Sequence, residues 1–524
     1  MIKQNYFDLQ ANESNRQTNA SNEIKNETSV NNWQFQQEKQ EKQKQERRQL
    51  NFLNKLWNIL KEFCYKIFRA RYPNVTEYKI YSIQDLATIE KSSKLQDLIV
   101  DYKHHKLLTR QLFRTFQFIQ QQKNLRFLYF CLRGQITNKL LFEDLIELIL
   151  NLNKIEKLKI DLTECKLRQL VYHSIRAYEK QKINLDQIEN RKLQNLKILI
   201  LKFRYSDLSS SIVFYLDQIL HECPNLKNLQ LDFSQNTLDS SFFEDIGFKC
   251  AELERLDHFK IDMSQTYFYS SFQLTDKLQP FFERIGRIKS LDINFSQNEF
   301  NDVKIEQICK GFQKLTNTER LKLNLGNNEF EFNFNQILQP IFYRNLTHID
   351  LDISQNIFLN KLSYYQCQLK RHILYSANSF SFFMKNINEL CNLRVAIYRF
   401  EAIGIDEEVH QHFGCFIGKS FPTLYELNLQ FKQNLVNYQC INRLLEEAKN
   451  ASKLKKITLN LRENQIKTKE VESAFEGLQQ LSNLEEIDIN FEYSYLSQKE
   501  IETWEQKFKQ SFKRQKINIL ISKI

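Results

Sequence analysis

Apolar residues recur at a nearly constant interval along most of this chain. The segment NLKNLQLDFSQN (225–236) has the order apolar-x-x-apolar-x-apolar-x-apolar, with Leu226, Leu229, Leu231 and Phe233 as its apolar positions. The pattern starts again every 28–32 residues, except across gaps of 41 residues (Ile155 to Leu196) and 47 residues (Leu346 to Leu393). Such a period is the signature of a repeat architecture. The starts are Leu95, Leu125, Ile155, Leu196, Leu226, Leu256, Ile288, Thr318, Leu346, Leu393, Leu424, Leu454, Leu484 and Arg514.

Each repeat predicts a strand followed by a helix. Alternating apolar residues such as Leu229, Leu231 and Phe233 indicate a strand with one buried face. Helical spacing follows, for example in 441–448 and 471–481. A strand–helix–strand connection makes neighbouring strands parallel, and each unit buries its apolar faces against the next.

Asparagine recurs at one fixed position, three residues after the last apolar residue of the strand. At this position an amide side chain can bond the backbone of neighbouring turns. We therefore expect a ladder of asparagine side chains where the chain leaves the sheet. The six residues are Asn236, Asn298, Asn328, Asn356, Asn434 and Asn464.

On these residues the chain resembles leucine-rich-repeat proteins, most closely the ribonuclease-inhibitor-like type with long helical repeats. The resemblance covers residues 95–524 and implies an α/β horseshoe, with parallel strands on the concave face and helices outside. It also implies a binding scaffold without chemistry of its own. One departure is an additional apolar residue before the asparagine, such as Phe233, which predicts a strand one step longer.

The domain organisation follows from where the repeats start. Residues 1–50 are polar and charged and predict a disordered leader, with a coiled, charged helical extension in its last part as the alternative. Residues 51–90 include an amphipathic segment, 52–68, which predicts a helical cap on the repeats or a helix that binds a partner. Residues 91–524 are the solenoid of about 14 repeats. An aromatic-rich insertion, 359–392, is either a binding lobe or a longer helix pair.

Composition adds limits on location. The net charge of +11 permits acidic partners without specifying nucleic acid. The ten cysteines are scattered singly, as in an intracellular protein with reduced thiols. No signal peptide and no apolar run of 18 residues is present, so we expect a cytoplasmic protein, with the nucleus as an alternative, and no membrane span.

The motifs of catalysis are missing from the sequence. It contains no GxGxxG, GxxxxGK[ST], GxSxG or HExxH motif. The segment EEVHQHFGC (407–415) places His410, His412 and Cys415 close together, but histidines two apart point to different faces of a helix. We expect no enzyme activity, no cofactor and no metal.

The outward positions of the strands should form columns along the concave face. In the middle repeats these columns are rich in Asp and Asn, which predicts a polar, locally acidic surface for a partner. Its candidate residues are Asp232, Asp262, Asp292, Asn294, Asn324, Asp350 and Asp352. The early repeats carry a candidate basic patch, formed by Lys103, Arg133, Lys159, Lys202 and Arg204.

The expected function is protein–protein recognition by the concave face, as a scaffold or adaptor. Nucleic-acid binding through the basic early repeats is the alternative, with steep salt dependence as its mark. An adaptor whose N-terminal helix recruits an enzyme such as a ubiquitin ligase rests on family analogy, and residues 52–68 lack an F-box pattern. The sequence does not specify an oligomeric state, and a monomer is the default expectation.

Overall fold

The computed structural model divides the chain into two units, Met1–Val75 and Thr76–Ile524. The structure describes residues 77–81, 95–103, 107–136, 139–167, 193–208, 212–269, 271–328, 330, 345–356, 390–403 and 422–523, all in the second unit. The predicted leader, the amphipathic segment 52–68, most of the aromatic insertion and the histidine-containing segment 407–415 lie outside the described residues.

One parallel sheet extends through the whole of the second unit. Within the described residues it contains fifteen strands that follow each other in chain order, and each pairs with its neighbours in parallel. Two short strands, β7 (Thr237–Asp239) and β9 (Tyr267–Tyr269), form a separate parallel pair. The strands of the main sheet are β1 (Glu77–Ile80), β2 (Asp97–Asp101), β3 (Phe127–Cys131), β4 (Lys157–Asp161), β5 (Ile198–Lys202), β6 (Asn228–Asp232), β8 (His258–Asp262), β10 (Ser290–Asn294), β11 (Arg320–Asn324), β12 (His348–Asp352), β13 (Val395–Arg399), β14 (Glu426–Gln430), β15 (Lys456–Asn460), β16 (Glu486–Ser494) and β17 (Lys516–Lys523).

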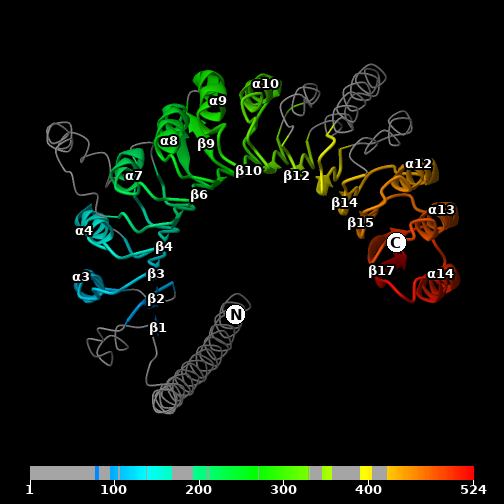
Figure 1. The fold of residues 1–524 in the computed structure, drawn as a ribbon, viewed down its shortest axis with the longest axis horizontal. Coiled ribbons are helices and arrows are strands. Elements are labelled where there is room, and N and C mark those ends of the chain that lie inside the picture. Colours follow the sequence, from blue (N-terminus) through cyan, green and yellow to red (C-terminus); the bar gives the residue numbers. More distant parts are fainter. Residues whose placement is uncertain are drawn as a thin grey trace, which may run out of the picture. The chain divides into compact units, whose positions relative to one another are not determined.

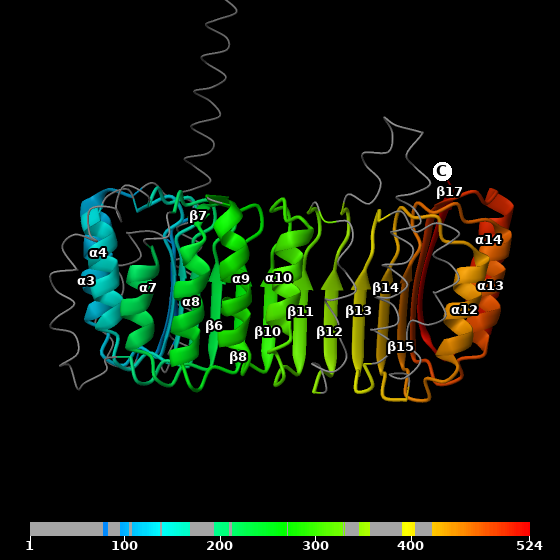
Figure 2. The same cartoon turned by 90° about the horizontal axis from the view of Figure 1, so that it is seen from above.

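Helices connect many of these strands and lie on the outer side of the sheet. In Figure 1 the strands of the second unit line the inside of an arc and the helices its outside, and Figure 2 shows the strands side by side with a common direction. The fold is therefore the predicted leucine-rich-repeat solenoid. The described helices are α3 (Thr109–Gln120), α4 (Lys139–Leu150), α7 (Ile212–His221), α8 (Ser241–Glu252), α9 (Ser271–Ile285), α10 (Asp302–Phe312), α12 (Tyr438–Ala448), α13 (Thr468–Gln479) and α14 (Gln498–Ser511).

The sheet starts one strand earlier than the repeat pattern predicts. Strand β1 pairs in parallel with β2 and lies inside the range 51–90 that we assigned to a helical cap. Its residues Tyr78 and Ile80 match the second and third apolar positions, with Val75 as the first, but Ser82 stands at the fourth and Leu95 follows only 20 residues after Val75. Because this interval is shorter than the 28–32 residues that separate most repeats, the repeat pattern did not predict the strand.

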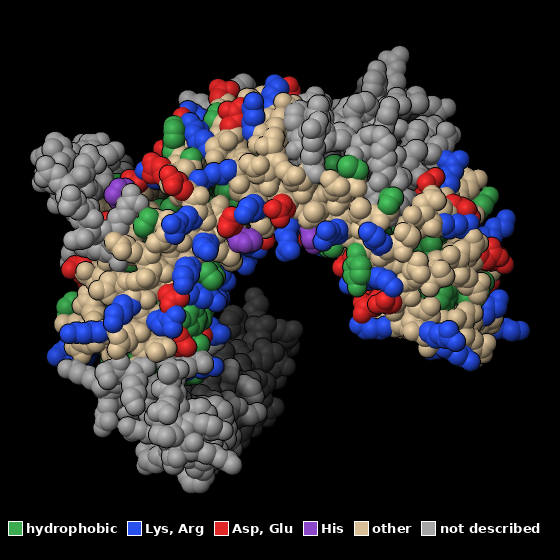
Figure 3. Space-filling model, in the orientation of Figure 1, with side chains coloured by type: hydrophobic (Ala, Val, Ile, Leu, Met, Phe, Trp, Pro, Cys, Tyr) green, Lys and Arg blue, Asp and Glu red, His purple; other side chains and the backbone are tan. Residues whose placement is uncertain are grey.

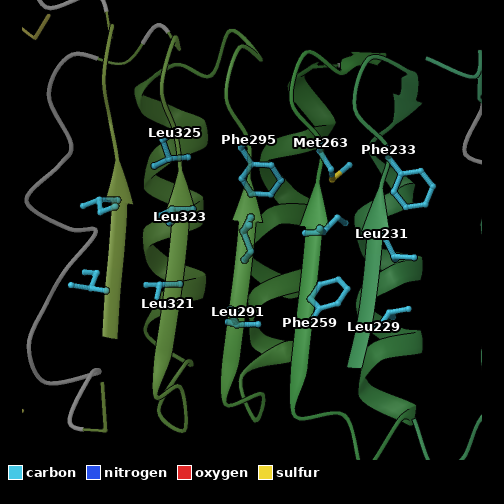
Figure 4. Close-up of a cluster of buried hydrophobic side chains, with 14 of the residues drawn as sticks. Leu229, Leu231, Phe233, Phe259, Met263, Leu291, Phe295, Leu321, Leu323 and Leu325 are labelled. Carbon is cyan, nitrogen blue, oxygen red and sulfur yellow. The ribbon is translucent and has the colours of Figure 1, made fainter. Parts of the chain in front are cut away.

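The apolar positions of the strands form one continuous core between sheet and helices. Figure 4 shows them in β6 to β12, where Leu229, Leu291 and Leu323 point to the helical side of the sheet. These three side chains are at most 1% exposed, and burying one contributes about 1.5–3 kcal/mol relative to leaving it in water. Edge-to-face ring contacts such as Phe282–Phe295 and Phe282–Phe312 link neighbouring units.

The turn after β6 corrects one detail of the prediction for that unit, whereas β16 does include its fourth apolar residue, Phe491. Strand β6 ends at Asp232, so the additional apolar residue Phe233 does not lengthen the regular strand. The backbone N–H of Phe233 nevertheless donates to the carbonyl of Asp262 at 2.7 Å, and that of Gln235 to Ser264 at 2.9 Å. The extra residue therefore extends the hydrogen bonding between units into the turn.

Candidate recognition surface

The asparagine ladder holds these turns in a fixed geometry. The Asn328 side chain donates to the carbonyls of Phe295 (3.0 Å) and Leu325 (2.8 Å) and accepts from the N–H groups of Asn298 (3.0 Å) and Phe300 (3.1 Å). The other five predicted asparagines are likewise buried and donate to carbonyls of their own or the preceding unit. The predicted ladder is present, and in these six units it connects the turn after each strand to the neighbouring unit.

Most of the predicted Asp/Asn column has a structural use in the same turns. Asp232, Asp262, Asn294, Asn324 and Asp352 each accept, through Oδ1, the backbone N–H two residues later, at 2.9–3.1 Å. The same bond occurs in units without a partner prediction, at Asp101, Asp161, Asn460 and Asn490. An Asx turn at the strand end therefore explains why Asp or Asn recurs there.

The two remaining acidic candidates lie in the neighbouring column and are paired with cations. Asp292 accepts from Lys260 Nζ at 2.7 Å, and Asp350 lies 3.4 Å from Lys322 Nζ and also contacts Arg399. Figure 3 shows Lys or Arg beside Asp or Glu along the hollow edge of the arc. Two of the five predicted acidic side chains in this part of the concave face are therefore paired with cations, while Asp232, Asp262 and Asp352 accept from their own turns.

The predicted basic patch divides into two locations. Lys103 and Arg133 lie past the strand ends, where they face Asp101 and Glu164, and Arg204 there donates to Gln235 at 3.2 Å. Lys159 and Lys202 lie on strands β4 and β5 and point into the concave face. The five side chains thus do not form one surface of uncompensated positive charge.

An apolar group on the concave face was missed in the sequence. Phe127, Ile198, Tyr129 and Ile200 occupy outward positions of β3 and β5 and are half-buried. Strand β4 lies between them, so Lys157 has Phe127 and Ile198 as its cross-strand neighbours, and Lys159 has Tyr129 and Ile200. We call these six residues the framed lysine pair.

The local geometry of the pair is set by the aromatic rings. Lys157 Nζ lies 5.2 Å from the ring centre of Phe127, and Lys159 Nζ lies 4.4 Å from that of Tyr129, within the range of cation–π attraction. Burial, and then the charge of Lys202, lowers the pKa of Lys159. Comparing the same outward position in consecutive units would have revealed this group from sequence.

Cys250 in α8 and Cys440 in α12 are buried in the core. Burial raises the pKa of the Cys250 and Cys440 thiols to about 12, so both are protonated at neutral pH. Across the part of the chain that the structure describes, no group of three His, Cys, Asp or Glu side chains is arranged to hold a metal ion. None of the described helices combines the length and apolar character of a membrane span.

Comparisons with known proteins do not identify a partner. No family model matches the chain, and no curated protein matches it. One similar solved structure is a crystal structure of a TLR13–ssRNA13 complex, with 14% sequence identity and a TM-score of 0.24. The match covers 77% of this chain and 63% of that one, so this chain spans less than two thirds of its length. At this TM-score the likeness carries no argument about what this chain binds.

Proposed function

We propose that this protein recognises another protein through its concave face and acts as a non-catalytic scaffold or adaptor, in the manner of ribonuclease-inhibitor-like repeats. The observation that carries the proposal is the continuous parallel pairing of neighbouring strands from β1 to β17. Fifteen strands give fourteen steps of about 4.8 Å, a surface roughly 67 Å long. That length suits a macromolecule better than a metabolite.

The concave face also varies along its length, as a specific recognition surface requires. Strands β3 to β5 carry the framed lysine pair, and β8 to β12 carry paired charges. Strands β14 and β15 carry uncharged polar side chains such as Asn428, Gln430 and Thr458 at the same positions. Aromatic and charged groups in fixed positions give a partner both its register and its orientation.

The test is affinity purification of the full chain followed by mass spectrometry, with variants in separate parts of the concave face. A first variant carries Lys157→Gln, Lys159→Gln and Ile200→Ser, and a second carries Lys260→Ser, Asp292→Ser and Lys322→Ser. Replacing Asp232, Asp262 and Asp352 is a poor choice, because each of them also holds its turn. The expected result is a protein partner lost with at least one variant.

The control is a variant on the helical side, Lys499→Ser with Glu502→Ser, where both residues are exposed on α14. Circular dichroism checks that all variants keep the wild-type melting temperature. If every protein recovered with the wild type is also recovered with both concave variants, recognition by this face is excluded. If partners are lost only with the α14 variant, the binding surface is convex.

Nucleic-acid binding, the alternative, receives less support from the described residues. Lys103 and Arg133 face acidic groups and Arg204 bonds a glutamine, so three of the five predicted cations have local partners. A strand of phosphates lying across the early repeats would also meet Asp97, Asp101 and Asp161. Protein therefore remains the proposed partner.

A further inference from the structure

The concave face neutralises most of its lysines with acidic side chains on adjacent strands. Lys260 contacts Asp292, Lys322 contacts Asp350, Lys456 contacts Glu426 and Lys516 contacts Glu486, at 2.7–3.4 Å. Lys202 lies between Asp161 and Asp232 in the register of the sheet. Charge compensation across strands is thus the common arrangement on this face.

Lys157 and Lys159 depart from that arrangement. Their neighbours on both sides are aromatic or aliphatic, and neither lysine has a carboxylate within 4.0 Å among the described residues. Of the lysines on the described concave strands, these two alone have apolar neighbours in both flanking strands. Two cations on neighbouring positions of one strand are therefore offered within an apolar frame.

Such a frame is complementary to a ligand that brings its own carboxylates and its own apolar side chains. A carboxylate between Lys157 and Lys159 would supply the negative charge that the neighbouring strands lack. Lys159 is partly buried, which strengthens its attraction to such a carboxylate, and Lys157 is exposed. Leu, Ile or Phe side chains of the same ligand would cover Tyr129, Ile198 and Ile200, which are half-buried and face the hollow.

We propose that the framed lysine pair is the docking site for an acidic polypeptide segment in which Asp or Glu residues alternate with large apolar residues. The inference rests on the proposed function and assigns it a place on the concave face and a chemical class of partner. From β3 to β5 the frame is two steps of about 4.8 Å wide, roughly 10 Å. This width accommodates a short segment of the partner, so other parts of the face remain available to the rest of it.

A polyanion such as single-stranded nucleic acid fits the frame less well. The ammonium groups of the two lysines already lie over the rings of Phe127 and Tyr129, the only aromatic faces on which a base could stack there among the described concave residues of β2 to β5. A phosphate chain also has no apolar groups for Ile198 and Ile200, and Asp161 stands at the end of the same strand.

The experiment is selection of a phage-displayed library of random 12-residue peptides on the immobilised full chain. Before each round, phage that bind the Lys157→Gln/Lys159→Gln variant are removed. Enriched peptides are synthesised with a fluorophore and titrated by anisotropy. The expected peptides contain at least two Asp or Glu with Leu, Ile, Phe, Tyr or Trp, and their Kd rises at least tenfold on the double variant and on Ile200→Ser.

A matched control is the Lys260→Gln/Lys456→Gln variant, which removes two lysines that are paired with Asp292 and Glu426. It should leave the Kd within about twofold. Enrichment of peptides without acidic residues, or no enrichment that depends on Lys157 and Lys159, overturns the inference. A labelled dT oligonucleotide that competes with the peptides and loses affinity on the same variant also overturns it, in favour of a polyanion.

Affinity purification with the two concave variants separates the inference from the proposed function. If the partner found by affinity purification is lost with the Lys260, Asp292 and Lys322 variant only, concave recognition is correct and the framed lysine pair is the wrong place. If no partner depends on any concave residue, both fail.

Discussion

At the residue scale, buried asparagine side chains connect the turns of neighbouring units. Asn328 is 2% exposed, and its amide bonds backbone groups of its own and the preceding unit. Replacing it with alanine leaves several buried backbone groups without partners. We expect Asn328→Ala to lower the free energy of unfolding by about 2–4 kcal/mol, measured by urea denaturation.

The comparison for this change is Asn483→Ala. Asn483 also donates to a backbone carbonyl of the preceding unit, that of Ser452 at 2.9 Å, but its side chain is exposed to water. Water can replace its bond, so the cost should stay below about 1 kcal/mol. Equal losses in both variants would show that burial of the ladder is not what makes it stabilising.

A second residue-scale feature is the left-handed backbone just before the ladder position. In five units this residue is a glutamine, with φ between 53° and 60°. The five are Gln235, Gln265, Gln297, Gln355 and Gln433. This conformation brings Cβ close to the following carbonyl oxygen, and β-branched residues tolerate it least. We expect Gln297→Val to destabilise the protein by about 1–2 kcal/mol in urea denaturation, and Gln297→Gly by much less.

The matched change places valine on extended backbone instead. Thr458 lies within β15, where valine is favoured, so Thr458→Val should change stability by less than about 0.5 kcal/mol. A Gln297→Val variant as stable as wild type would mean that the turn relaxes to another conformation.

Sequence reasoning at this scale succeeded for asparagine and was incomplete for aspartate. A buried amide at one fixed repeat phase has few uses other than bonding the backbone, so Asn328 could be interpreted from its position alone. Asp232 stands at an equally fixed phase, yet a carboxylate on a strand can face water, a ligand or its own turn. The structure shows that Asp232 bonds its own turn, because the backbone N–H of Ser234 donates to Asp232 Oδ1 at 3.1 Å.

At the element scale, close helix packing depends on single glycines. In α13, a Cβ added at Gly477 would lie 2.6 Å from Cδ1 and 2.7 Å from Cβ of Leu445 in α12. The two helices would have to move apart. We expect Gly477→Ala to lower the free energy of unfolding by about 1–2 kcal/mol despite the higher helix propensity of alanine. Thermal denaturation with Glu476→Ala, an exposed position on the same helix, as the control would test this; a raised melting temperature for Gly477→Ala would contradict the packing argument.

The start of α14 gives a prediction about pH. The Glu500 carboxylate accepts from the hydroxyl and backbone N–H of Ser497 and from the Thr468 hydroxyl, and these bonds, that of Ser497 foremost, lower its pKa to about 2. Since the folded-state pKa lies below the ordinary value of 4.5, the stabilisation is complete above pH 4.5 and is lost as the pH falls toward 2.

We therefore expect Glu500→Gln to be less stable than wild type at pH 7 and to approach it as the pH falls from 4.5 toward 2. Urea midpoints measured across this range would test the prediction. Glu502→Gln on the same helix, where the side chain bonds that of Gln498, serves as the control. A difference between Glu500→Gln and wild type that is constant with pH would exclude the capping carboxylate as its cause.

Elements with the full pattern were predictable, and shorter or interrupted ones were not. In the main sheet, each strand from β2 to β17 has an apolar-x-apolar core that recurs at the repeat interval. All fourteen predicted repeat starts precede one of these strands. Strand β1 lacks the interval, and β7 and β9 contain three residues each, too few for alternation to register. The framed lysine pair was missed for a different reason, because it exists only across three units.

At the scale of the whole molecule, stability should be local, because each unit packs mainly on its neighbours. Strand β11 pairs with β10 and β12 and has no contact with β15 or β16 in the register of the sheet. Leu323, in β11, is 1% exposed, and truncating such a side chain costs about 2–5 kcal/mol. In a solenoid this loss should weaken adjacent units and fade with distance.

Hydrogen exchange measured by mass spectrometry tests this expectation. In Leu323→Ala we expect amides of β10, β11 and β12 to exchange at least tenfold faster, with β15 and β16 unchanged within about twofold. Ile489→Ala, a buried position of β16, is the mirror-image variant and should accelerate β15 to β17 while sparing β10 and β11. Equal acceleration of every strand in both variants would mean that the arc opens only as one cooperative body. In that case the concave face could not adjust one segment to a partner without loosening the rest, so the two variants also measure how independently each part of this surface can bind.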